Sequence, residues 1–240
     1  MLFYREFGNK EGKLLVFIHG GFTTSESYMK QFGLFEEFHC IFVDLPKHGN
    51  SDKKGIFSCR RAADEVIELV DAISPKEKVV LIAHSYGGLT AKLILAKIPQ
   101  RIEKCVIGST NIKKTPLFWI YTRKAGCIFL WLQNKERYKK DHISWKLVCE
   151  TQKDAWRNFR LTDLDRYKDV PILFLFAQHD IKEIKESMVL WKRQMHSAGI
   201  VEIKNAGHNY FWEFPDVVNP IIRSFVKGEN NVYEKFDSVK

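Results

Sequence analysis

Ser85 lies in a stretch whose residue types can make a serine hydroxyl reactive. The apolar segment Val79–Ala83 leads into a polar pair, then two glycines, then a helix-compatible segment that stops before Pro99. That order predicts a strand, a very tight turn and a helix. A serine on such a turn has a strained backbone, and the small residues Ala83 and Gly87 avoid a clash with the neighbouring strand or helix. The turn therefore presents the Ser85 hydroxyl to a substrate.

Two later segments of the chain end in groups that could activate this serine. A serine hydroxyl is a poor nucleophile at neutral pH, so acyl transfer needs a nearby base and a carboxylate that orients the base. Asp180 follows the apolar segment Pro171–Ala177, and His208 follows a shorter apolar segment near Ile200–Ile203. Ligand-binding groups gather at the carboxyl ends of strands in open α/β sheets. Each residue also has a structural explanation, since Asp180 could cap the next helix and His208 could brace a loop.

These segments resemble motifs of the α/β-hydrolase family. Ala83-His84-Ser85-Tyr86-Gly87-Gly88 is similar to the nucleophile elbow Gly-x-Ser-x-Gly, with alanine for the first glycine. Ala177-Gln178-His179-Asp180 is similar to the family's Gly-x-x-Asp, and Gly207-His208 to its Gly-His. The order serine, acid, histidine is also that of the family. The resemblance covers nearly the whole chain and implies a catalytic triad of Ser85, Asp180 and His208.

A glycine-rich loop follows the predicted strand Leu14–Ile18. It reads His19-Gly20-Gly21-Phe22-Thr23-Thr24-Ser25, and its glycines allow backbone N–H groups to point at an anion. In the α/β-hydrolase family such a loop supplies one half of the oxyanion hole, and the residue after the nucleophile supplies the other. The resemblance therefore implies Gly21, with Phe22 as the adjacent candidate, and Tyr86 as backbone donors. His19 is expected to brace the loop.

Four other titratable residues near predicted strand ends are expected to take no part in catalysis. Asp44, His48 and Asp52 lie in a turn-rich segment that resembles the family's structural loop Asp-x-x-Gly-x-Gly-x-Ser. His179 is the nearest rival to His208 as the base, but its side chain should point away if that of its neighbour Asp180 points inward.

Short apolar segments alternate with helical patterns over most of the chain. Residues 58–73, for example, repeat apolar side chains every three or four positions and predict an amphipathic helix. The alternation predicts a mostly parallel sheet with helices on both faces, the α/β-hydrolase fold. At the amino end, residues 1–18 predict a β-hairpin and residues 25–38 a helix.

The alternation stops between Ser109 and about Asp169. This stretch is rich in aromatic and basic residues and predicts several short amphipathic helices, at the point where many α/β-hydrolases carry a cap. We therefore divide the chain into a core, 1–108 and 170–240, and a helical cap or lid insertion, 109–169. Most of the aromatic residues should form the core of the cap itself, and the others would line an apolar pocket.

Length and composition favour one globular domain. The chain has 240 residues, 45% of them hydrophobic, and five cysteines with no close pair, which favours free thiols in a reducing compartment. We find no signal-peptide pattern and no long uncharged apolar run, so a cytoplasmic protein without stable membrane insertion is expected. The net charge of +9 is spread along the chain without a nucleic-acid-binding module, so no nucleic-acid partner is expected.

These observations predict a serine hydrolase, carboxylesterase-like, that cleaves a small apolar or aromatic acyl compound through an acyl-enzyme. No metal or organic cofactor is expected. The same triad in this family also serves carbon–carbon bond hydrolases, thioesterases, lactonases, peptidases and lyases. A non-catalytic binding protein on the same fold is a further alternative, and the basic, aromatic insertion leaves open a role at a membrane surface.

Overall fold

The computed structural model describes residues 2–34 and 36–229. Its strands are β1 (Tyr4–Gly8), β2 (Leu14–Ile18), β3 (His39–Val43), β4 (Val79–His84), β5 (Ile102–Gly108), β6 (Ile172–Ala177) and β7 (Ala198–Ile203). Its α-helices are α1 (Cys59–Ile73), α2 (Tyr86–Lys97), α3 (Pro116–Tyr121), α4 (Lys124–Gln133), α5 (Lys135–Lys140), α6 (Trp145–Asn158), α7 (Lys182–Lys192), α8 (Tyr210–Glu213) and α9 (Pro215–Lys227). Short 3₁₀ turns are η1 (Ser25–Tyr28), η2 (Phe32–Leu34), η3 (Pro99–Arg101) and η4 (Leu164–Arg166). Residues 230–240 of the predicted core lie outside the described residues.

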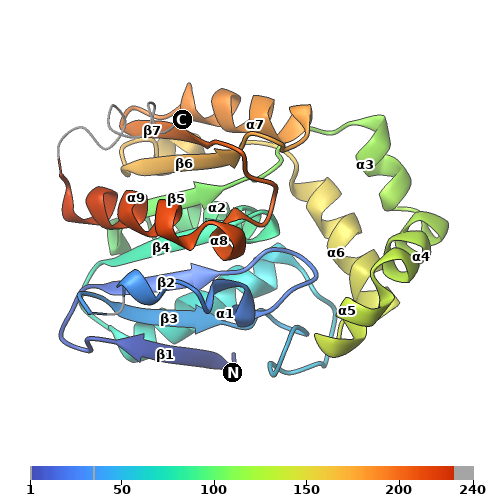
Figure 1. Cartoon of the computed structure of the whole chain (residues 1–240), viewed down its shortest axis with the longest axis horizontal. Helices are drawn as coiled ribbons and strands as arrows, with labels where there is room; N and C mark the ends of the chain where they lie inside the picture. The colour runs from blue at the N-terminus through green and yellow to red at the C-terminus, as the bar shows by residue number, and fades with distance from the viewer. Residues whose placement is uncertain (1, 35, 230–240) are drawn as a thin grey trace.

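The strands form one seven-stranded sheet in the order β1-β3-β2-β4-β5-β6-β7. Every neighbouring pair is parallel except β1 and β3, which are antiparallel. Parallel neighbours need a crossover between them, and the helices provide it. The predicted mostly parallel α/β fold is confirmed (Figure 1).

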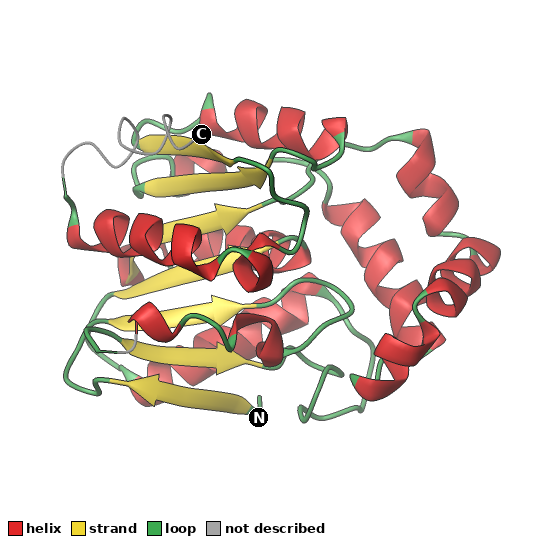
Figure 2. Ribbon diagram, in the orientation of Figure 1, coloured by secondary structure: helices red, strands yellow, loops and turns green. Residues whose placement is uncertain are grey.

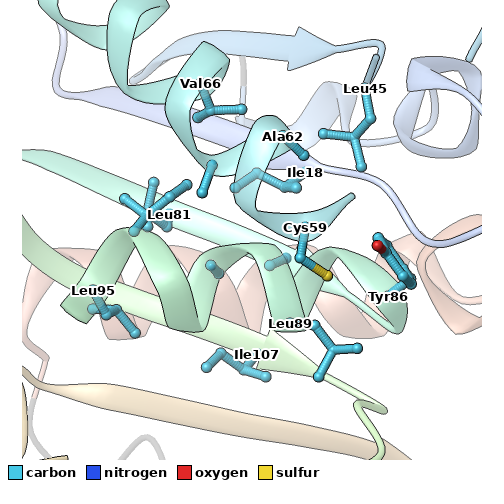
Figure 3. Close-up of a cluster of buried hydrophobic side chains, with 14 of the residues drawn as sticks. Ile18, Leu45, Cys59, Ala62, Val66, Leu81, Tyr86, Leu89, Leu95 and Ile107 are labelled. Atoms are coloured by element: carbon cyan, nitrogen blue, oxygen red, sulfur yellow. The ribbon is translucent and has the colours of Figure 1, made fainter. Parts of the chain in front are cut away.

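Alternate residues of the central strands belong to two separate buried clusters, one on each face of the sheet. In β4, Leu81 and Ala83 face α1 and α2, whereas Val80 and Ile82 face the opposite side, where α9 packs. The first cluster is drawn in Figure 3, where Val66 of α1 and Leu89 of α2 lie over the strands. This period-two alternation explains why the central strands read as unbroken apolar runs.

The predicted hairpin at the amino end is wrong. Strand β1 pairs with β3, and β2 lies between β3 and β4 with all five residues buried. A fully apolar strand needs neighbours on both edges and cover on both faces, which a terminal hairpin cannot supply. Strand β1 is partly exposed, as an edge strand is expected to be.

The helix predicted over residues 25–38 is replaced by the two short turns η1 and η2. The backbone N–H of Ser25 donates to the Asp44 carboxylate at 2.7 Å, and the Gln31 side chain donates to the Phe211 carbonyl at 2.6 Å. These long-range bonds hold the segment against the sheet, so it cannot wind into one continuous helix. Helix α7 is likewise shorter than the predicted 183–196, because the N–H of His196 donates to the Lys168 carbonyl at 2.9 Å.

Helices α3 to α6 lie between β5 and β6 in the chain and stand outside the sheet (Figure 2). Helix α6 lies nearest to the sheet, and α3, α4 and α5 form the outer rim of the molecule (Figure 1). Ser144 caps the start of α6 by accepting from the Leu147 N–H, and Thr115 caps α3 in the same way through the Phe118 N–H.

Candidate active site

Ser85 sits on the turn between β4 and α2, at the carboxyl edge of the sheet. Its backbone has φ +55° and ψ −120°, a conformation that few residues other than glycine adopt. The Ser85 N–H donates to the Gly108 carbonyl at 2.7 Å, and its carbonyl accepts from the Gly88 N–H at 3.0 Å. These bonds fix the turn, so the hydroxyl projects into the space above the sheet.

The side chains of His208 and Asp180 reach this hydroxyl from the loops after β7 and β6. His208 Nε2 lies 3.0 Å from Ser85 Oγ, and His208 Nδ1 lies 2.7 Å from Asp180 Oδ1. Three strands thus bring together residues that are far apart in the sequence. The resulting chain of hydrogen bonds can pass a proton from the serine to the imidazole while the carboxylate holds the ring.

Asp180 is held in its ionised form by its neighbours. Burial alone would raise its pKa, but the His208 imidazole opposes this through a hydrogen bond and its charge, and the net pKa is below the ordinary value. The Ser109 hydroxyl and the Ala177 N–H both donate to Asp180 Oδ2, the latter at 2.8 Å. A carboxylate with three donors in the fold orients an imidazole well.

Sequence reasoning overlooked Ser109 and His84. Ser109 follows β5 directly, and its position at a strand end beside Gly108 was the available signal. The ring of His84 lies 4.7 Å from that of His208, centre to centre. Desolvation, with a smaller contribution from the charge of His208, lowers the pKa of His84 to about 3, so His84 stays neutral beside His208.

The predicted oxyanion residues Gly21, Phe22 and Tyr86 line the same cavity as Ser85. Tyr86 is the first residue of α2, where backbone N–H groups lack a partner within the helix. Phe22 has φ +63°, so the loop turns sharply at this point. Among the described residues we find no acceptor for the N–H of Phe22 or Tyr86. Both groups are therefore free to bind an anionic oxygen.

Two other titratable residues near the strand ends, His19 and Asp44, take structural positions. His19 is fully buried, and its Nε2 accepts from the Leu45 N–H at 2.9 Å. Asp44 accepts from the backbone N–H groups of Ser25 and Asn50. His179 is also among the residues that border the cavity. In the described part of the chain, only His208 forms a side-chain hydrogen bond to the Ser85 hydroxyl, whereas the Thr110 hydroxyl donates to the Ser85 carbonyl at 3.0 Å.

The cavity above Ser85 has a volume of about 760 Å³. Helices α2, α3, α6 and α7 contribute the apolar residues Leu89, Phe118, Ala155 and Ile184 to its wall, and Phe159 follows α6 directly. Polar and charged residues of the loop after β2 and of α5 also line it, among them Glu26, Arg137 and Lys140. The cavity is therefore large enough for a drug-sized ligand with an apolar part and a polar part.

A buried carboxylate joins this site to α6. Asp154 accepts from the Tyr86 hydroxyl at 2.6 Å and from the Cys59 N–H at 2.7 Å. Tyr86 follows the candidate nucleophile directly, so Asp154 fixes α6 relative to the candidate oxyanion donor. The sequence showed Asp154 only as one more charge in a helical segment.

The sequence profile of the Alpha/beta hydrolase family matches residues 15–221. The chain therefore belongs to the Alpha/beta hydrolase family, as its elbow, acid and histidine motifs predicted.

Individual relatives are distant. The cis-3-alkyl-4-alkyloxetan-2-one decarboxylase of Shewanella oneidensis is 24% identical over 262 residues, which cover 90% of this chain and 82% of that protein. Salicylic acid-binding protein 2 of Nicotiana tabacum is 34% identical over 102 residues, which cover 40% of this chain and 39% of that protein. A thermophilic esterase from Thermogutta terrifontis superposes with a TM-score of 0.78 and 22% identity, covering 97% of this chain and 94% of the esterase. This last likeness shows a shared fold.

Within the residues that the structure describes, no helix has the length and apolar character that crossing a bilayer requires. The same residues contain no group of three or more histidine, cysteine, aspartate or glutamate side chains placed to hold a metal ion.

Proposed function

We propose that this protein is a serine hydrolase that cleaves a carboxylic ester through an acyl-enzyme. The observation that carries the proposal is the continuous chain of hydrogen bonds from Ser85 Oγ through His208 to Asp180. It lies at the carboxyl edge of a mostly parallel sheet, beneath a cavity of about 760 Å³, which is large enough for a small molecule.

The proposed reaction begins at Ser85. Its Oγ attacks the ester carbonyl carbon while His208 Nε2 accepts the hydroxyl proton, and Asp180 stabilises the imidazolium that forms. The carbonyl oxygen becomes an oxyanion and binds the N–H of Tyr86 and that of Gly21 or Phe22. The tetrahedral intermediate then collapses, the C–O bond breaks, and His208 donates its proton to the departing alcohol. A water molecule, deprotonated by His208, hydrolyses the acyl-enzyme in the same way.

We assign the insertion 109–169 the role of a cap over this site. Cavity residues from its helices support the assignment, among them Phe118 of α3, Arg137 and Lys140 of α5, and Ala155 of α6. The apolar side chains on α2, α3, α6 and α7 suit an acyl chain or an aromatic ring of the substrate.

The test is the variant Ser85→Ala, assayed with p-nitrophenyl esters of graded acyl length. Removing a triad serine lowers kcat by roughly 10⁴- to 10⁶-fold, and we expect a loss in that range. A fluorophosphonate probe should label Ser85 in the unaltered protein and leave Ser85→Ala unlabelled. Ser224→Ala on α9, where the hydroxyl pairs with Glu229 at 2.7 Å, is the matched control and should keep activity and labelling. Near-normal ester hydrolysis by Ser85→Ala would refute the proposal.

The leaving group is tested separately. A matched series containing an ester, a thioester, a lactone and a diketone of the same acyl part compares the carbon–oxygen, carbon–sulfur and carbon–carbon bonds that a triad can cleave. We expect the linear ester to have the highest kcat/KM. A faster reaction with one of the other three would reassign the reaction within the same triad chemistry.

A further inference from the structure

Four large apolar side chains are exposed on α3 and α4, the outer helices of the insertion. The exposed fractions are 45% for Trp119, 51% for Ile120, 53% for Phe129 and 56% for Leu132. All four fall within an eighteen-residue segment, Pro116–Gln133. A cluster of this kind on a protein surface marks a place where something apolar is bound.

Beside these apolar residues lies a second cavity, separate from the one above Ser85, with a volume of about 460 Å³. Its lining residues come from α3, α4, α6 and the turn between the first two: Trp119, Thr122, Arg123, Lys124, Lys153, Trp156 and Arg157. Four of the seven are cations and none is acidic. Trp119 belongs to both features, since it is exposed and also forms part of the cavity wall.

The cations of this cavity are available to a ligand. In the described residues, no carboxylate forms an ion pair with Arg123, Lys124, Lys153 or Arg157. Instead, the Arg123 guanidinium lies 4.7 Å from the centre of the Trp119 ring and the Lys124 ammonium 5.7 Å from that of Trp145. A ring face holds a cation in place but supplies no formal negative charge.

The insertion as a whole concentrates positive charge. Residues 109–169 contain fourteen lysines and arginines and seven aspartates and glutamates, so they carry seven of the nine net positive charges of the chain. Two of those acids, Glu150 and Asp154, are already engaged by Lys47 and by Tyr86. The exposed apolar cluster therefore sits in a strongly positive field.

We propose that the α3–α4 surface, made of the four apolar residues and the four cavity cations named above, docks on an anionic lipid bilayer. The apolar side chains enter the interface between headgroups and acyl chains, and the cavity takes lipid phosphates. Two copies of this chain would meet positive against positive, which disfavours self-association through this surface. A nucleic acid would match the cations but would leave Ile120, Phe129 and Leu132 facing water. Of these three occupants, the anionic lipid surface is the one that matches both the charge and the apolar cluster.

The proposal is tested by sedimenting the full chain with vesicles of phosphatidylcholine alone or of phosphatidylcholine with phosphatidylglycerol. We expect binding to the anionic vesicles only, with a loss of more than tenfold when salt rises from about 0.05 M to about 0.5 M, because exposed charges are then screened. Ser85→Ala should bind equally well, since docking does not depend on the proposed chemistry.

Two pairs of substitutions separate the charge from the apolar contribution. Arg123→Gln with Lys124→Gln should weaken binding roughly twenty-five-fold, because each surface cation contributes about a fivefold factor. The matched control is Lys76→Gln with Lys78→Gln, exposed in the loop between α1 and β4. Phe129→Gln with Leu132→Gln should weaken binding at least roughly tenfold. Its control is Val189→Gln with Leu190→Gln, which are 36% and 43% exposed on α7.

Several outcomes would overturn the proposal. They are the absence of binding to anionic vesicles, equal losses in the control pairs, or equal binding to neutral vesicles. Binding of a single-stranded RNA oligomer in place of vesicles, weakened by the Arg123 and Lys124 pair, would assign a nucleic acid. A dimer in light scattering that the Phe129 and Leu132 pair abolishes would assign a second copy.

Discussion

Three residues around the candidate site hold left-handed backbone conformations that non-glycine residues rarely adopt. They are Phe22 at φ +63°, Ser85 at φ +55° and Ser109 at φ +41°. Each follows a strand of the sheet closely, and each borders the cavity. Strain of this kind costs about 1–3 kcal/mol at each residue and persists where the surrounding structure enforces it. The strain at the carboxyl edge of the sheet therefore lowers stability while it fixes the positions of side-chain hydroxyls and backbone amides that border the cavity.

The first prediction concerns the Ser109 side chain. Its hydroxyl donates to Asp180 Oδ2, and Ser109→Ala leaves that oxygen with one donor fewer. We expect kcat for ester hydrolysis to fall about tenfold, because one hydrogen bond to a charged group contributes about 1.5 kcal/mol. The pKa of Asp180 should rise, so activity should disappear at a higher pH on the acidic side than in the unaltered protein. Rate profiles from pH 4 upward measure both effects.

Ser187→Ala is the control for Ser109. Ser187 is a fully buried serine on α7 whose hydroxyl donates to the Glu183 carbonyl at 2.6 Å, outside the triad. Its loss should lower stability without moving the pH profile. If Ser109→Ala behaved in the same way as Ser187→Ala, Ser109 would be a structural residue only.

Among the elements, the contact between α2 and β2 determines how closely the elbow approaches the sheet. At Gly87 a Cβ atom would overlap the backbone carbonyl oxygens of Ile18 and His19, which cannot move away as a flexible side chain could. We expect Gly87→Ala to lower the free energy of unfolding by about 1–3 kcal/mol, the usual cost of overpacking. Urea denaturation measures this directly.

Gly207→Ala is the comparison for Gly87→Ala. A Cβ at Gly207 would meet one atom, Glu213 Oε2, at 3.9 Å, which is ordinary contact. The free energy of unfolding of Gly207→Ala should change little, although the family motifs have glycine at both positions. Equal destabilisation by the two substitutions would show that the space around the glycine is irrelevant.

Helix α6 links the outer helices to the core through buried polar contacts. Glu150 pairs with Lys47 at 2.7 Å, and Asp154 accepts from Tyr86 and Cys59. At the C-terminal end of α6, the buried ammonium of Lys92, which belongs to α2, donates to the carbonyls of Asn158 and Arg160 at 2.8 and 2.5 Å. Cationic groups at a helix C-terminus also interact favourably with the helix dipole.

Because Lys92 is buried and titrates, its contribution to the free energy of unfolding should depend on pH. Desolvation lowers its pKa to about 8, below the ordinary value of 10.5. Between these values the unfolded chain binds a proton that the folded chain has lost, so the free energy of unfolding rises with pH. We expect the difference in stability between the unaltered protein and Lys92→Met to increase by about 3 kcal/mol from pH 7 to pH 10.5. Urea denaturation of both proteins at several pH values measures this difference, and Lys146→Met, exposed on α6, is the control.

A difference in stability that is the same at every pH would contradict this account of Lys92. Because both proteins share all other titrating groups, those contributions cancel in the comparison.

At the level of the whole molecule, the reactivity of the five cysteine thiols measures global unfolding. Cys40, Cys59, Cys105, Cys127 and Cys149 are all free and buried. Burial raises the pKa of Cys40 and of Cys127 to about 12, so at pH 8 their thiols are almost entirely protonated as well as inaccessible. We expect a disulfide reagent to modify all five at once in denaturant, and in the native protein only at the rate of unfolding. A thiol that reacted within seconds in the native protein would contradict the packing of its helix or strand.

The sequence predicted the sheet and the convergence of Ser85, Asp180 and His208 for two reasons. The turn at Ser85 is specified locally by small residues and glycines, and the carboxyl ends of parallel strands always meet at one edge. The sequence missed the pairing of β1 with β3 and the donors around Asp180. Those features depend on residues far apart in the chain, and no local pattern records which strand lies beside which.

The amino-acid sequence by itself determined the alternation of strands and helices, the tight turn at Ser85 and the family. These follow from side-chain periodicity and backbone preference, which act over a few residues. Only the tertiary structure decided that Ser109 donates to Asp180, that Asp154 joins α6 to Tyr86, and that cations and apolar side chains meet on α3 and α4. Such contacts arise when elements pack, because packing distances and burial are properties of the folded chain as a whole.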